Sequence, residues 1–215
     1  MRNKTTLTFS ISQYRQPLLK IRFIHYLLSL IAIMACCMQT AYCQPPAIEW
    51  DRSFGGLKQE EMYAMIQTAD GGYLLGGDSD SPVSGAKTQG SQGINDYWVV
   101  RTNGSGIKLW DKRFGGSSRE ELFAVKQTPD GGFILGGWSM SAISGDQTQI
   151  SRGSSDYWIV KVDADGNKLW DKRYGGPGDD ELRAMEITSD GGYIFVGESS
   201  SGIGGEKTES NHGEF

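Results

Sequence analysis

Three copies of one 60-residue sequence repeat account for most of this chain. A Trp-Asp-x-x-aromatic-Gly-Gly phrase opens at tryptophans that are 60 residues apart: Trp50, Trp110 and Trp170. An Asp-Gly-Gly turn recurs at the same spacing, beginning at Asp70, Asp130 and Asp190. A fixed period of this length is typical of solenoids, propellers and other repeat architectures, so the repeat decides the fold before any other feature does.

The second copy divides into four strand-length segments, which are residues 121–128, 133–138, 156–162 and 168–174. Aromatic and β-branched residues are frequent in them, and Gly-containing turns at 129–132 and 163–167 accept the positive φ of tight hairpins. No helical period is found outside the first 43 residues. Four short antiparallel strands per tandem unit predict an all-β fold, specifically a β-propeller with four-stranded blades of 60 residues.

The repeat also predicts the domain organisation of residues 44–215, a partial β-propeller. We expect an outer strand at 48–54, blade one at 60–114, blade two at 120–174, and a half blade at 180–198 followed by a loop to 215. About three copies make an incomplete ring, because propellers use about four to eight blades. We therefore expect a piece of a longer protein, whose remaining blades are its partners and whose lone first strand completes the last blade. The alternative is a short chain that closes by oligomerising.

Residues 1–43 have the pattern of a secretory signal peptide. They contain five Arg and Lys residues and no acid, and an apolar run extends over 27–38. A transmembrane helix needs about 20 residues, so this run is too short to span, and Ala41-Tyr42-Cys43 resembles a cleavage site. The segment predicts a secreted or cell-surface protein with no membrane span after cleavage. An uncleaved anchor and a lipid anchor at Cys36 are the alternatives.

Charge and composition exclude several classes of function. The net charge is −5, and the leader carries +5, which leaves −10 for the rest. That balance argues against a nucleic-acid partner. Cleavage after Cys43 leaves no cysteine and only His212, so a disulfide, a His-based metal site or a Ser-His-Asp triad is hard to build. We expect no catalytic residues, no cofactor and no metal, and hence no enzyme.

Acidic residues form the first set of candidate sites. Pairs of acids open the first strand of each repeat: Glu60-Glu61, Glu120-Glu121 and Asp180-Glu181. Around a channel mouth they would suit a hard cation such as calcium, but we favour a role in capping turns. Asp163, Asp165 and Asn167 have the alternating oxygen spacing of a calcium loop, yet the glycine and glutamate of an EF-hand are absent, so a hairpin turn is preferred.

Two long polar loops, at 78–95 and 139–155, form the second candidate site. Loops of this length are uncommon unless they bind something or move. Such loops would lie on one rim of a propeller in every blade, and there Trp138 and Tyr97 could stack on sugar rings. The alternative, which we favour, is that the loops are solvated connectors.

The repeat resembles that of bacterial β-propeller proteins found in secreted and surface locations. The resemblance rests on the Asp-Tyr-Trp-Ile-Val-Lys run at 156–161, then Gly166, Trp170 and Gly175-Gly176, and the Asp-Gly-Gly-Tyr run at 190–193. It covers residues 47–215. The sequence of the repeat also resembles that of exported proteins from gliding-type bacteria that use type IX secretion. The resemblance implies export and a propeller fold rather than a reaction.

These observations predict an exported, noncatalytic β-propeller repeat module that serves as a scaffold, in adhesion or in ligand binding at the cell surface. The expected partner is a cell-surface glycan or protein. The alternative is a propeller-based carbohydrate-active enzyme whose catalytic blade lies outside this sequence, since such enzymes take acid and base carboxylates from several blades.

Overall fold

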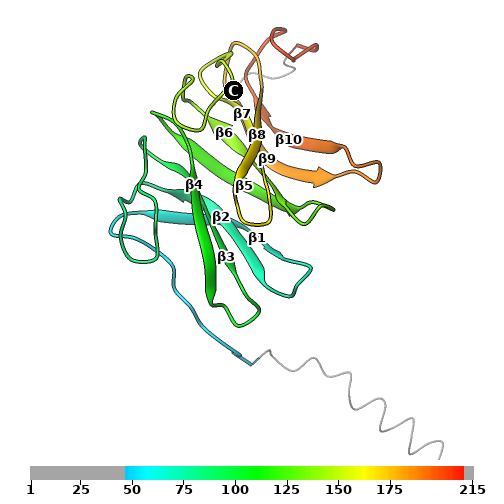
Figure 1. Cartoon of the computed structure of the whole chain (residues 1–215). Helices are drawn as coiled ribbons and strands as arrows, with labels where there is room; N and C mark the ends of the chain where they lie inside the picture. The colour runs from blue at the N-terminus through cyan, green and yellow to red at the C-terminus, as the bar shows by residue number, and fades with distance from the viewer. Residues whose placement is uncertain (1–46, 211–215) are drawn as a thin grey trace, which may run out of the picture. The chain divides into compact units, whose positions relative to one another are not determined.

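The computed structural model describes residues 47–210, and within them the protein is entirely β, with ten strands and no helix (Figure 1). The chain divides into two units, Met1–Glu49 and Trp50–Phe215, and all ten strands belong to the second. The predicted signal peptide lies outside the described residues. The strands are β1 (Glu60–Gln67), β2 (Tyr73–Ser79), β3 (Asp96–Thr102), β4 (Lys108–Phe114), β5 (Glu120–Gln127), β6 (Phe133–Ser139), β7 (Asp156–Val162), β8 (Lys168–Tyr174), β9 (Asp180–Ile187) and β10 (Tyr193–Ser199).

The strands form three antiparallel sheets in which every strand pairs with its neighbour in sequence. The first sheet has the order β1-β2-β3-β4, the second β5-β6-β7-β8, and β9 pairs with β10 as a two-stranded ribbon. The four strands predicted for the second repeat are confirmed, with ends that differ by no more than one residue. The predicted hairpin turns are confirmed as well. Gly131 closes the β5–β6 turn with a φ of 83°, a left-handed conformation that glycine adopts without strain.

The outer strand predicted at 48–54 is wrong, because these residues form no strand. Their counterparts in β4 pair with β3 of the same sheet. A fourth strand pairs with the third strand of its own repeat, and the described residues contain no such strand before residue 48. One contact of an outer strand is nevertheless made, since Trp50 packs edge-on against Tyr73 at a ring distance of 5.6 Å, as Trp110 does against Phe133 at 6.2 Å.

Each first strand contains a β-bulge at the same repeat position. The extra residues opposite the second strand are Tyr63, Phe123 and Arg183. A glycine at the facing position permits each bulge: a Cβ on Gly137 would lie 1.9 Å from the carbonyl oxygen of Glu121. Bulges turn a side chain out of the regular alternation of a strand. The three bulged residues consequently meet one another, with Tyr63 stacked on Phe123 at 4.8 Å and the Arg183 guanidinium 4.7 Å from the Phe123 ring.

The core lies between sheets rather than within one of them. One buried cluster joins Leu74 and Tyr97 of the first sheet to Leu122 and Trp158 of the second. A second cluster joins Ile134 of the second sheet to residues of β9. The first strand of the following sheet therefore covers the sheet before it: β5 lies against β1, β2 and β3, and β9 lies against β5, β6 and β7.

Candidate functional site

A groove of about 460 Å³ lies at the junction between the first and second sheets, at the end where the hairpin turns gather. Five separate segments line it, namely the β1–β2 turn, β3, β4, the β5–β6 hairpin and the β7–β8 turn. Its lining residues are Ala69, Asp70, Arg101, Leu109, Trp110, Gln127, Gly131, Phe133, Ala164 and Asp165. No single stretch of sequence forms this site.

Trp110 is the aromatic centre of the groove. It lies on β4, and its ring meets Phe133 of the next sheet at an interplanar angle of 63°. The indole Nε1 donates a hydrogen bond of 3.2 Å to the carbonyl oxygen of Ala164. Gly166 lies against the ring so closely that a Cβ there would be 3.0 Å from it. These contacts hold the indole in one orientation.

Asp70 and Arg101 supply a charged pair on the first sheet's side of the groove. Both carboxylate oxygens of Asp70 accept hydrogen bonds of 2.6 Å from one guanidinium nitrogen of Arg101. The Thr68 hydroxyl donates to the same carboxylate at 2.6 Å, and the backbone N–H of Gly72 donates at 3.2 Å. The hydrogen bond from Thr68 contributes most, and with those from Gly72 and Arg101 it lowers the pKa of Asp70 to about 2. Asp70 is therefore ionised at neutral pH.

Gln127 ties the two sides of the groove together. Its Oε1 accepts a hydrogen bond of 2.8 Å from the backbone N–H of Ala69, in the preceding sheet. Across the groove Asp165 lies at the tip of the β7–β8 turn, and its side chain is exposed. Fixed hydrogen-bonding groups beside the face or edge of a tryptophan suit a ligand that carries both hydroxyls and apolar C–H surface.

The junction between the second sheet and the β9–β10 ribbon has only some of the corresponding residues. Ile187 stands where the first junction has Gln127, and Lys161 replaces Arg101. Lys161 keeps the ion pair, at 2.9 Å from Asp130. Among the described residues, the second junction therefore keeps the charged pair, loses the amide, and has no counterpart of the β7–β8 turn.

The acidic pairs, for which turn capping was preferred over a cation ring, are divided between two structural positions. The first acid of each pair turns into the Gly-Gly loop. Glu120 accepts hydrogen bonds from the backbone N–H of Gly116 at 2.8 Å and from the Ser139 hydroxyl at 2.7 Å. Asp180 accepts from Gly176 at 2.7 Å, and Glu60 accepts from Ser79 at 3.1 Å. The capping interpretation is confirmed for Glu120 and Asp180, whereas within the described part of the chain Glu60 accepts only from the hydroxyls of Ser79 and Ser81.

The second acids, Glu61, Glu121 and Glu181, lie near the bulged residues of the first strands. Arg183 pairs with Glu181 at 2.6 Å, and Arg119 lies 3.6 Å from Glu121. Asp78 of β2 is buried beside them. Burial, with smaller contributions from the charges of Glu121 and Glu61, raises the pKa of Asp78 to about 6. Within residues 47–210, no three acidic, histidine or cysteine side chains are arranged to hold a metal ion.

The Asp163–Asn167 segment is a hairpin turn, as preferred. The Asp163 carboxylate accepts hydrogen bonds from the backbone N–H groups of Asp165 and Asn167, at 3.0 and 2.8 Å. The Asn167 side-chain amide donates to the second oxygen at 3.0 Å. All of these bonds are internal to the turn that joins β7 to β8.

Trp138 and Tyr97 were candidates for stacking on sugar rings, the less favoured interpretation of the loops, and this interpretation is wrong. Trp138 is 6% exposed and Tyr97 is fully buried, with the Tyr97 ring packed against Trp158 of the following sheet. The long loops are themselves packed inside: Lys87 donates to the Ser79 hydroxyl at 2.6 Å, and Gln147 donates to the Ser139 hydroxyl at 2.8 Å. The loops are thus structured connectors, with a hollow of about 520 Å³ along the second one.

Sequence reasoning did not single out Arg101 or Gln127, and it treated Trp110 only as packing between blades. One signal was available, because Gln127 and Arg101 lie where the copies of the repeat differ from one another. Positions that vary inside a regular repeat are candidates for a specific role, whereas positions shared by all copies maintain the fold.

No family model matches the chain, and no curated protein matches it. Across the part of the chain that the structure describes, no helix has the length and hydropathy needed to cross a membrane.

Proposed function

We propose that this chain is an exported, noncatalytic β-propeller repeat module that binds glycans at the cell surface through the groove at its first sheet junction. The propeller part of the proposal is supported by the way successive sheets meet. Tyr63, Phe123 and Arg183 bring the first strands of all three sheets side by side. First strands that adjoin in this way are the arrangement around a propeller axis.

One observation carries the binding part of the proposal, namely the combination of Trp110 with fixed polar groups in one groove of about 460 Å³. A sugar offers an apolar face of C–H groups and a periphery of hydroxyls. The indole suits the first, and Gln127, Asp70 and Asp165 supply acceptors and donors for the second. Asp70 is occupied by an ion pair with Arg101, which suits binding better than proton transfer.

Binding of soluble polysaccharides, measured by affinity electrophoresis and calorimetry, tests this proposal. Neutral probes such as laminarin, xylan and dextran are compared with anionic alginate. Trp110→Ala is expected to weaken binding by about tenfold or more, since aromatic anchors dominate the energy of binding sites. Trp170→Ala, the same change at the second junction, is the matched control and is expected to leave binding unchanged. Absence of binding to every probe, or equal losses in both variants, would refute glycan recognition by this groove.

The export part of the proposal rests on the basic and apolar pattern of residues 1–43. Expression of the complete chain in a Gram-negative host, followed by mass spectrometry of the extracytoplasmic protein, should give a product that begins at Gln44. A product that keeps its first 43 residues and stays in the cytoplasm would contradict export.

A further inference from the structure

The edge of β10 differs from the edges of β2 and β6, its counterparts in the first and second sheets. β2 pairs with β3, and β6 pairs with β7, whereas β10 pairs only with β9 within residues 47–210. The registers of the two complete sheets agree. Gly77 lies opposite Trp98, and Gly137 lies opposite Trp158. A strand added to β10 in the same register would place a side chain of that kind opposite Gly197.

Trp158 shows what such a residue contacts. It is fully buried, and its ring lies 4.8 Å from that of Tyr97 in the preceding sheet. The Tyr97 hydroxyl donates a hydrogen bond of 2.9 Å to the carbonyl oxygen of Trp158. The same hydroxyl lies close to Gly137, at 2.7 Å from the position a Cβ would take. Tyr97 thus contacts both β6 and β7 of the neighbouring sheet.

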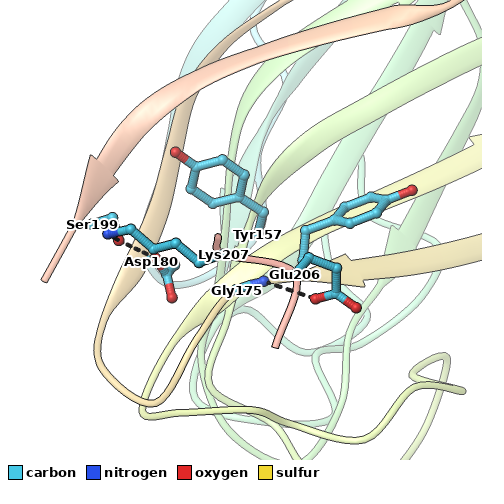
Figure 2. Close-up of a pocket in the computed structure, with 7 residues that line it drawn as sticks. Tyr157, Gly175, Asp180, Ser199, Glu206 and Lys207 are labelled. Atoms are coloured by element: carbon cyan, nitrogen blue, oxygen red, sulfur yellow. Dashed lines mark hydrogen bonds between the residues drawn. The ribbon is translucent and has the colours of Figure 1, made fainter. Parts of the chain in front are cut away.

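Tyr157 holds the corresponding position beside the β9–β10 ribbon. Its hydroxyl is also 2.7 Å from the position a Cβ would take on Gly197. Tyr157 and Tyr174 line a cavity of about 250 Å³, together with Gly175, Asp180, Ser199, Glu206 and Lys207 (Figure 2). Tyr97 and Phe114, their counterparts, are buried in the cluster that contains Trp158. The cavity is therefore the equivalent of the space that Trp158 fills at the first junction.

Lys207 adds a charge at the place where the added strand would begin. In the first sheet, Lys87 donates to the Ser79 hydroxyl at 2.6 Å, and Ser79 lies opposite Asp96 in the register. Lys87 also lies within electrostatic reach of Asp96 and 5.9 Å from the centre of the Trp98 ring. Lys207 donates to the Ser199 hydroxyl at the same distance of 2.6 Å. An acid two residues before a tryptophan would meet this ammonium group.

We propose that the β10 edge, with the Tyr157–Tyr174 cavity and Lys207, is a docking site for an extended Asp-aromatic-Trp segment, which pairs antiparallel with β10 and inserts its tryptophan beside Tyr157. Backbone hydrogen bonds to an open sheet edge supply affinity in this mode of recognition, and the side-chain cavity supplies specificity. The proposal depends on the comparison of the sheets, not on glycan binding, so either can fail alone.

A labelled peptide tests the site in the full chain. The probe is a synthetic peptide of residues 155–174, which carries the Asp-Tyr-Trp sequence of β7 and the hairpin to β8. Fluorescence anisotropy should show saturable binding. Trp158→Ala in the peptide should weaken it by about tenfold or more, because the cavity residue provides the specificity. Tyr157→Ala in the protein should have a similar effect, and Tyr63→Ala, an exposed tyrosine on β1, should have none.

Because the Tyr157→Ala variant could lose binding by misfolding, an exchange of charges provides a second test. Lys207→Glu in the protein should weaken binding of the natural peptide, and Asp156→Lys in the peptide should restore it. Failure of the peptide to saturate, equal binding of the Trp158→Ala peptide, or no restoration by the exchanged charge would overturn the proposal. So would a concentration-dependent dimer that the peptide does not dissociate, because a second copy would then be the occupant of this edge.

Discussion

The second sheet and the β9–β10 ribbon are built from the same repeat, yet they differ in what covers them. Ile134 of β6 is fully buried, and Ile194 at the same position of β10 is 54% exposed. The local structure is nevertheless the same in both. Asp180 caps its loop as Glu120 does, and the β9–β10 turn is closed by Gly191 with a φ of 84°. In this protein, strand formation depends on the repeat itself, whereas burial depends on the sheet that follows.

The largest expected difference concerns tryptophans at and outside a covered junction. Trp158→Ala should lower the free energy of unfolding by about 3–5 kcal/mol, since the indole is fully buried between two sheets. Trp170→Ala should cost less than half as much, because Trp170 is 37% exposed. Urea denaturation followed by circular dichroism measures both. Equal losses would mean that burial between sheets is not the main source of stability.

The isoleucine pair applies the same comparison to the sheet faces. Ile134→Ala should lower the free energy of unfolding by about 2–4 kcal/mol, because it removes contacts with Leu182 and Met185 of the next sheet. Ile194→Ala should change it by no more than about 0.5 kcal/mol, as is usual for exposed sites. A large loss at Ile194 in a monomeric sample would contradict the exposed state of this face.

Tyr97 and Tyr157 occupy the same repeat position and allow the contribution of one hydrogen bond to be measured. Tyr97→Phe should cost about 1 kcal/mol, because the buried bond to the Trp158 carbonyl is removed. Tyr157→Phe should have almost no effect on the free protein. When the residue 155–174 peptide is bound, Tyr157→Phe should weaken the complex, which makes this variant sensitive to occupation of the β10 edge. Thermal denaturation with and without the peptide distinguishes the two states.

The smallest expected effect is a pH dependence that arises at one junction. Burial near Glu121 and Glu61 raises the pKa of Asp78, against opposing contributions from Asn95 and Arg119. The ordinary pKa is 3.8 and that of folded Asp78 is about 6, so the folded state binds more protons between these values. Stability from Asp78 must therefore increase as the pH falls from 7 towards 4.

The Asp78→Asn variant should remove part of this pH dependence. Asp96 and Glu121, whose pKa values are also raised by burial, contribute to the pH dependence that remains. The exposed Glu198, which occupies the position of Asp78 in the ribbon, serves as the control through Glu198→Gln. Melting temperatures measured from pH 7.5 to 4.5 should have a smaller slope for Asp78→Asn alone. Identical slopes in all three proteins would contradict the assignment.

The strands and turns could be predicted from sequence because each depends on residues close together in the chain. Gly-containing turns and runs of aromatic and β-branched residues located β5 to β8 to within one residue. Exposure could not be predicted in this way. Tyr97 follows the polar residue Asp96 in sequence, but its ring is covered by Trp158, which lies 61 residues later in the chain. The bulge at Phe123 also shifts the alternation of side chains between the two faces of the sheet, and no single residue of β5 predicts the bulge.

The groove around Trp110 was beyond prediction for a related reason. Its lining comes from five segments, and the bond from Ala69 to Gln127 joins residues of different sheets. A pattern within one repeat cannot show that a residue in one turn lies beside an amide in the next copy. Only the relative placement of whole sheets brings these groups together.

The order of the strands in each sheet has a consequence for how the chain folds during synthesis. Every sheet is a meander of consecutive strands, so each needs only one repeat of the sequence to form. Ribosomes add about 5–20 residues per second, which gives each 60-residue repeat several seconds, whereas a hairpin forms in about 1–10 μs. Each sheet can therefore be complete before the next one emerges, and its uncovered face is ready to act as the template on which the following repeat settles.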